Sequence, residues 1–175
     1  MVIGSEAKSA ALNLRADLYT SACLYTGGMR SLLKVKLLRP DAKPPTIAHP
    51  GEDLGYDIYA AEEVVLEPRG AAVVPTGIAI EIVAHTGEPM GALLRDKSSM
   101  AARRLITTAG VIDAGYRGEI KVVMENLSDT QARISAGDKI ANMIPYPVLT
   151  GNVEIVQSLT ESSRKAGGFG SSGTN

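Results

Sequence analysis

Residues 109–120 have the sequence AGVIDAGYRGEI, in which one carboxylate, Asp113, follows apolar residues and precedes a glycine-containing turn. The apolar pair before the turn and the alternating residues 119–124 after it predict a β-hairpin with Tyr116 just past its tip. If a pocket forms against this hairpin, Asp113 would be in a position to take part in catalysis. Asp also commonly begins a turn before Gly, so spacing alone leaves both interpretations of Asp113 open.

Short runs rich in β-branched residues alternate with glycine and proline from Leu32 onward, which predicts an all-β domain. Prolines fall between or at the edges of these runs, where a missing amide donor costs no ladder bond. Many short antiparallel strands limit their exposed edges by closing into a jelly roll or a barrel. One helix of one or two turns is predicted to begin near Ser98 or Ser99, because either serine can cap it. The predicted strands cover residues 33–38, 64–66, 71–74, 78–83 and 120–124.

The size and charge of the chain limit its class. Its 175 residues suffice for one domain whose core needs neither disulfide nor metal. A formal net charge of −1 provides no broad basic field for nonspecific binding to nucleic acid. Local backbone amides and a few cations can nevertheless hold a triphosphate, so the net charge does not exclude nucleotides.

The first 28 residues do not have the pattern of an export signal. Lys8, Arg15 and Asp17 interrupt their apolar character, which argues against both a signal-peptide core and a membrane span. Cys23 is the only cysteine, so the chain can form no internal disulfide. We therefore expect a reducing, cytoplasmic setting.

Five segments carry patterns that occur together in one known family. In order and spacing they resemble the motifs of the trimeric deoxyuridine triphosphatase (dUTPase) family, and the match covers most of the chain from Met29 onward. The segments are GYDIYA at 55–60, KSSMA at 97–101, the segment 109–120 above, GDKIANMI at 137–144 and RKAGGFGSSG at 164–173.

The resemblance implies a fold, an assembly and an activity. The implied fold is a jelly roll of the β-clip type with one short helix, and the implied assembly is a homotrimer with active sites shared between subunits. The activity is Mg²⁺-assisted hydrolysis of dUTP to dUMP and pyrophosphate, which serves dUMP biosynthesis and keeps uracil out of DNA. The expected divisions are a mobile extension at 1–28, a β domain at 29–157 and a flexible arm at 158–175 that closes over the active site.

Asp113 matches the position of the family's general base. Hydrolysis at the α-phosphorus needs a water that is held in line and partly deprotonated, and a carboxylate can do both. The resemblance therefore assigns Asp113 to orient the attacking water and accept its proton.

The resemblance assigns base and sugar recognition to residues around the predicted hairpin and to one residue of the arm. Strand amides and carbonyls between Thr107 and Ile112 would pair with the uracil edge, and Gly110 would permit close approach. Tyr116 would pack under deoxyribose and exclude a 2′-hydroxyl, or it is only a cross-strand packing residue. Lys121 would help fix the nucleotide, or it is a solvent-facing lysine. The full set is Thr107, Gly110, Val111, Ile112, Tyr116, Lys121 and Phe169.

The phosphates are assigned to the start of the predicted helix, to the fourth motif and to the arm. Amides, hydroxyls and a cation at a helix start form an anion site, although the same pattern also fits an ordinary cap. This chain has Lys97 and Ser99 where the family usually has Arg and Gly, and Asn142 where it commonly has Gln. The assigned residues are Lys97, Ser98, Ser99, Asn142, Arg164, Gly170, Ser171 and Ser172.

Asp57, in the first motif, matches a family residue that helps to hold hydrated Mg²⁺. Mg²⁺ keeps several waters and prefers phosphate oxygens, so this carboxylate would act through water, and no direct protein ligand is expected. The alternating apolar residues around it suggest a strand near the pocket wall. Without the resemblance, Asp57 would be read as a turn or salt-bridge residue.

Phe169 is the only phenylalanine of a chain without tryptophan, and it lies outside every predicted core segment. The glycines beside it would let its ring fold over a stacked base while backbone amides approach the phosphates and Arg164 clamps the γ-phosphate. In the family this arm closes over a site in the trimer and excludes bulk water. The alternative is an unstructured Gly/Ser terminus.

Two other functions remain open on sequence grounds. The related dCTP deaminases share the fold, but they need an acid–base group directed at the base and normally lack the Gly-Phe-Gly arm. A trimeric jelly-roll module that binds or regulates without turnover is the non-enzymatic alternative. Asp113 and the full arm favour the hydrolase.

Overall fold

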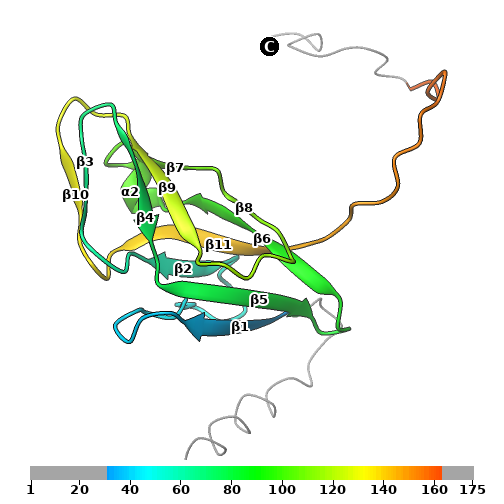
Figure 1. Ribbon diagram of the computed structural model, residues 1–175. Helices are drawn as coiled ribbons and strands as arrows, with labels where there is room; N and C mark the ends of the chain where they lie inside the picture. Colours follow the sequence, from blue (N-terminus) through cyan, green and yellow to red (C-terminus); the bar gives the residue numbers. More distant parts are fainter. Residues whose placement is uncertain (1–30, 163–175) are drawn as a thin grey trace, which may run out of the picture.

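The computed structural model describes residues 31–162, which form one short helix and many short strands (Figure 1). The predicted extension at 1–28 and the part of the arm from residue 163 onward lie outside the described residues. No helix within 31–162 is long and apolar enough to cross a membrane. The elements are β1 (Ser31–Leu37), β2 (Tyr56–Tyr59), β3 (Val64–Leu66), β4 (Ala71–Pro75), β5 (Ile78–Ala84), β6 (Pro89–Asp96), α2 (Ser98–Ala101), β7 (Leu105–Thr108), β8 (Val111–Ile112), β9 (Lys121–Asn126), β10 (Ala132–Ile134) and β11 (Lys139–Pro147).

The strands form three antiparallel sheets around one core. The largest has the order β1-β5-β6-β11-β2, and β8 pairs with β6 beside it. The second has the order β4-β9-β7, and the third pairs β10 with β3. Figure 1 shows β4 and β9 lying over the large sheet, with β3 and β10 at one end. The predicted all-β fold with one short helix is confirmed.

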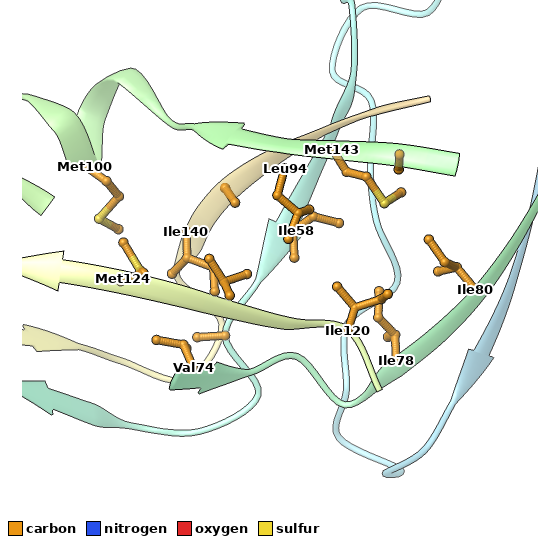
Figure 2. Packing of buried hydrophobic residues seen from close by; sticks show 14 of the residues in the cluster. Ile58, Val74, Ile78, Ile80, Leu94, Met100, Ile120, Met124, Ile140 and Met143 are labelled. Carbon is orange, nitrogen blue, oxygen red and sulfur yellow. The ribbon is translucent and has the colours of Figure 1, made fainter. Parts of the chain in front are cut away.

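The core is aliphatic, because the chain has no tryptophan and a single phenylalanine. Strand β9 buries every second residue, including Val122 and Met124, so one of its faces points inward. Figure 2 shows Leu94 of the large sheet and Val74 of β4 directed into the same cluster, where Met143 is fully buried. Flexible methionine side chains fill the gaps that stiff β-branched residues leave, and this keeps the space between the sheets closed.

The five predicted strands are confirmed within two residues at each end, as β1, β3, β4, β5 and β9. The predicted helix is confirmed as α2, which makes about one turn. Its predicted cap is wrong, because the N-cap position is Lys97, whose side chain makes no capping hydrogen bond. Ser98 and Ser99 lie inside the helix, since β6 ends at Asp96 and the chain enters the turn almost directly.

The predicted hairpin between residues 111–112 and 119–124 is wrong. Ile112 of β8 pairs with Ala92 of β6, whereas β9 pairs with β7. Residues 109–120 therefore leave the small sheet, contact the large sheet and return. Alternation of apolar and polar residues predicts strands, but it does not specify their partners.

Gly110 permits this crossing between the sheets. A Cβ atom at this position would stand 2.4 Å from the carbonyl oxygen of Leu94, closer than atoms can approach. With only hydrogen there, the Gly110 carbonyl accepts a hydrogen bond from the Leu94 amide at 2.6 Å. The close approach that the structure shows at Gly110 is that of strand β6, and the predicted approach of a nucleotide to Gly110 stays a prediction.

Asn126, at the end of β9, joins two sheets through its side chain and is only 1% exposed. Its amide nitrogen donates to the carbonyl oxygens of Leu66, Glu67 and Thr130 over 2.8–3.2 Å. Its Oδ1 accepts from the amide and the hydroxyl of Ser128. Sequence patterns gave no sign of this residue, because buried asparagine does not follow a periodicity.

Asn126→Ala is expected to lower the free energy of unfolding by about 2–4 kcal/mol, because it strands several buried polar groups. Urea denaturation at a fixed protein concentration measures this change. Asp129→Ala is the matched control, since Asp129 follows in the same turn but has an 81% exposed side chain paired with Arg69. The control should be close to neutral. Equal destabilisation by the two changes would contradict the role assigned to Asn126.

Candidate active site

Besides a cavity of about 10 Å³, Asp113 borders two larger cavities. The smaller has a volume of about 180 Å³ and includes Glu119 in its wall. The larger, of about 610 Å³, runs from β8 along the end of β11 to Thr150. The structure thus brings five of the predicted site residues together around the smaller cavity. These are Val111, Ile112, Asp113, Tyr116 and Lys121.

The carboxylate of Asp113 is exposed and forms neither a hydrogen bond nor an ion pair with any residue in the range 31–162. Its backbone oxygen accepts a hydrogen bond from the Tyr116 amide at 3.0 Å, which closes a tight turn. Asp113 therefore begins a turn and also lines the cavities. The two interpretations of this residue are compatible.

Tyr116 is held over the turn by its own hydroxyl. The hydroxyl donates to the Glu119 carbonyl at 3.1 Å, and the side chain remains 46% exposed. The ring lies so close to Gly118 that a Cβ there would stand 2.5 Å from the tyrosine oxygen. The Tyr116 ring thus packs directly over Gly118, a contact that sequence analysis missed. The only signal was a glycine two residues after a tyrosine in a turn.

Lys121 stands at the edge of the smaller cavity and is loosely held. Its side chain is 53% exposed and its Nζ lies 3.7 Å from Glu119 Oε2. The other oxygen of Glu119 accepts the Gly77 amide at 2.9 Å, which fixes the carboxylate in place. An exposed pair of this kind contributes little to stability, so the ammonium group is free to turn to a ligand.

Thr107 and Gly110 line neither of these cavities. The Thr107 amide donates to Asp96 Oδ1 at 2.6 Å, which ties β7 to the end of β6. The Thr107 hydroxyl is buried and has no hydrogen-bond partner among the described residues. Within one chain, the structure therefore does not bring these two predicted residues to Asp113.

A second cluster lies where three strands of the large sheet meet. Asp57, on β2, is only 8% exposed. Lys97 donates to its Oδ1 and Lys139 to its Oδ2, each at 2.7 Å. Strand β11 pairs with both β2 and β6, and this places Asn142 opposite Asp57 in the register. Ser98 follows Lys97, so three of the sequence motifs converge here.

Burial raises the pKa of the Asp57 carboxyl, but the hydrogen bonds from Lys139 and Lys97 outweigh it and hold the pKa below its ordinary value of 3.8. The same hydrogen bond raises the pKa of Lys139. The Asp57 carboxyl is therefore ionised, and the Lys139 amine protonated, at neutral pH. Two positive charges surround one negative charge, and this surplus suits a place where an anion binds.

The two clusters lie on opposite edges of β6. Ala92 pairs with Ile112 on one edge and with Pro145 of β11 on the other. Lys97 lies five residues beyond Ala92, which corresponds to roughly 16 Å along a strand. One chain therefore holds Asp113 well away from Lys97.

The remaining predicted site residues are in the arm and lie outside the described residues. They are Arg164, Phe169, Gly170, Ser171 and Ser172. Among residues 31–162, no three or more His, Cys, Asp or Glu side chains gather where they could hold a metal ion.

Comparison with known proteins identifies the family. A family model described as dUTPase matches residues 41–173. The chain belongs to the dUTPase family. The deoxyuridine 5′-triphosphate nucleotidohydrolase of Clostridium tetani is 41% identical over 144 residues, covering 81% of this chain and 96% of the relative. The corresponding Clostridioides difficile protein is 42% identical over 144 residues, covering 81% and 97%.

Solved dUTPase structures have the same fold. The Staphylococcus bacteriophage 80alpha dUTPase with dUpNHpp superposes with a TM-score of 0.74 at 31% identity, covering 82% of this chain and 99% of that one. A variant dUTPase of the S. aureus phage phi11, solved to show the coordination of a structural Mg(II) ion, gives a TM-score of 0.66 at 29% identity. It covers 74% of this chain and 99% of the phage chain.

The enzyme is a dUTP diphosphatase of nucleotide metabolism, and its reaction is the hydrolysis of dUTP. The comparisons decide between the functions that the sequence left open, because the relatives are nucleotidohydrolases rather than deaminases or binding modules. The fold predicted from the resemblance is confirmed by the same structures.

The lowered pKa of Asp57 predicts a loss of stability in acid. A carboxyl whose pKa is lower in the folded state stabilises the fold above its unfolded pKa, and this contribution disappears as pH falls through the folded pKa. The loss should begin near the ordinary value of 3.8 and be complete below the lowered one. Urea midpoints measured from pH 7 down to about pH 2.5 follow the effect.

Asp57→Asn should make the loss of stability at acid pH less steep. It should also reduce stability at pH 7, because both lysines lose their charged partner. Asp129→Asn is the control, since its side chain is 81% exposed. If the urea midpoint of the wild-type protein falls with pH no more steeply than that of Asp57→Asn, the lowered pKa of Asp57 does not contribute to acid stability.

Proposed function

We propose that the enzyme cleaves dUTP at the α-phosphorus, with Asp113 as the general base. The water attacks the phosphorus, its proton passes to the Asp113 carboxylate, and pyrophosphate leaves while dUMP remains. The observation that carries this assignment is the position of Asp113. Asp113 lines both cavities, and its carboxylate forms no hydrogen bond or ion pair with any residue that the structure describes.

Base and sugar selection is proposed for the smaller cavity. Uracil would bind along the backbone near Val111 and Ile112, where strand groups can pair with its edge and leave no room for a thymine methyl group. Tyr116 would pack under the deoxyribose, since its hydroxyl and the bare Gly118 hold the ring over the turn. Lys121 at the rim would help to fix the nucleotide. Phe169 from the arm would cover the base.

The phosphates are proposed to bind near Lys97. The backbone and hydroxyls of Ser98 and Ser99 follow this cation, and Asn142 lies on the neighbouring strand. In this structure Lys97 donates to Asp57, so its ammonium group would bind a phosphate either through a further N–H donor or by exchanging partners. The arm residues Arg164, Gly170, Ser171 and Ser172 would complete the set of donors.

Mg²⁺ is the proposed cofactor. Asp57 fits an outer-shell role, because it is one nearly buried carboxylate in a region without a cluster of acidic ligands among the described residues. When bound, the ion supplies positive charge to the phosphate oxygens. The chain's own residues hold Asp57 in place through Lys97 and Lys139.

A homotrimer with shared sites is proposed as the working assembly. Asp113 and Lys97 lie on opposite edges of β6 in one chain, so a second chain can supply the missing half of a site. Residues 148–162 form no strand, and Val153, Ile155 and Leu159 on this segment are 86–97% exposed. Apolar residues presented in this way favour burial against another subunit.

The proposed setting is cytoplasmic. A single cysteine leaves the fold independent of internal disulfides, and the substrate is a nucleotide of intracellular metabolism. Partition between cellular fractions tests this directly, and recovery only from an exported fraction would contradict it.

Asp113→Asn should retain nucleotide binding and lose turnover by about a hundredfold or more, because the amide cannot accept the proton of the water. Pyrophosphate release from dUTP with Mg²⁺ and calorimetric binding of dUpNHpp separate the two effects. Asp41→Asn is the control, because its carboxylate pairs with Arg39 away from both cavities. Near-normal turnover in Asp113→Asn would defeat the assignment.

A chain ending at Ser163 should lose dUTP turnover by about a hundredfold, because the arm supplies donors and excludes water. Pyrophosphate release from dUTP, dCTP, dTTP and UTP with Mg²⁺ is measured for this chain and for the full chain. The full chain should prefer dUTP over the other three. Equal activity of the two chains would refute the closing role of the arm, and equal rates on dUTP and UTP would refute the role of Tyr116.

A further inference from the structure

The ion cluster around Asp57 contains one lysine, Lys139, to which the proposed reaction gives no task beyond holding Asp57. Lys139 begins β11 and donates to Asp57 Oδ2 at 2.7 Å, while Lys97 donates to Oδ1 at the same distance. The Lys139 side chain is 43% exposed and that of Lys97 is 26% exposed. Each carboxylate oxygen therefore has its own ammonium group.

This arrangement bears on how Lys97 reaches a phosphate. When Lys97 turns from Asp57 to a phosphate, it leaves a carboxylate that is only 8% exposed. A buried carboxylate without any counter-ion is strongly unfavourable, so a lone ion pair would hold Lys97 in place. A second ammonium group on the other oxygen removes most of that obstacle.

We infer that Lys139 is a positioning residue that stays on Asp57 and thereby releases Lys97 to the triphosphate. The inference rests on the proposed role of Lys97 in phosphate binding. Lys139 is suited to stay, because it lies where β11 pairs with β2, opposite Tyr59, and its Nζ is also 6.0 Å from the Tyr59 ring centroid. Lys97 is suited to leave, because it stands at the entry to the one-turn helix rather than within a strand.

The chain offers a matched control for the charge of Lys139. Lys43 lies on the same side of β2, with its Nζ 5.5 Å from the centroid of the Tyr59 ring. It makes no ion pair with Asp57 and bonds instead to the Gly137 carbonyl at 3.5 Å. Lys43→Met therefore removes a similar charge from the same neighbourhood without changing the carboxylate's partners.

The test measures calorimetric binding of dUpNHpp in EDTA, so that no metal ion replaces the missing ammonium group. Lys139→Met should weaken binding about tenfold, because Asp57 then retains Lys97. Lys139→Arg should restore affinity, and Lys43→Met should leave it unchanged. Binding of deoxyuridine, which has no phosphate, should be the same in all variants.

A double-mutant cycle with Asp57→Asn separates this role from direct attraction between Lys139 and the phosphates. Without the carboxylate charge nothing retains Lys97, so Lys139→Met should have no effect on dUpNHpp affinity in the Asp57→Asn background. An equal loss in both backgrounds would overturn the inference. Unchanged affinity of Lys139→Met in the wild-type background would also overturn it.

Two further measurements keep the outcomes distinct. Where Lys139→Met does not fold, as judged by circular dichroism, Lys139→Gln replaces it, because this change removes the charge and keeps a polar side chain. Lys97→Met tests the underlying assignment. If Lys97→Met leaves dUpNHpp affinity unchanged, the proposed phosphate role of Lys97 fails; if only Lys139→Met is without effect, the positioning role alone fails.

Discussion

Strand β11 lies between β2 and β6, and the hydrogen-bond register of these three strands determines which residues of the sequence motifs become neighbours. The register places Asn142 opposite both Asp57 and Arg95, so motifs separated by some 40 residues in sequence become neighbours. An antiparallel ladder fixes such pairs to within one residue, because a slip by one residue would turn every side chain to the other face. The ion cluster follows from that register.

The connection 109–120 is governed by a different constraint, the contact of backbone with backbone at Gly110. Its carbonyl bonds the Leu94 amide at 2.6 Å, and no side chain would fit between them. This contact carries the chain from the small sheet to the large one and leaves Asp113 at the surface between two cavities. The position of the proposed base thus depends on a residue without a side chain.

Sequence patterns predicted the positions of several strands, but they missed the features that depend on contacts between distant segments. Periodicity located β9, because alternating burial leaves a direct mark on the sequence. A run of apolar residues located β5, whose first three residues are all buried. Both signals missed β6 and β11 as strands, since Pro89 begins one and Pro145 lies inside the other, where pairing with β2 has already ended at Met143. The partner of residues 111–112, the second lysine on Asp57 and the fully bonded Asn126 are tertiary facts that no spacing rule encodes.

The replacement of the family's usual arginine by Lys97 has a consequence for the ion cluster. An arginine fork commonly takes both oxygens of a carboxylate at once, whereas an ammonium group is a point charge that takes one. With Lys97 on Oδ1, the second oxygen is open to Lys139, and the structure has this division. A pair of single contacts is easier to exchange than one bidentate contact, because breaking one leaves the carboxylate neutralised. The lysine therefore changes how the charge on Asp57 is balanced as well as the shape of the proposed phosphate contact.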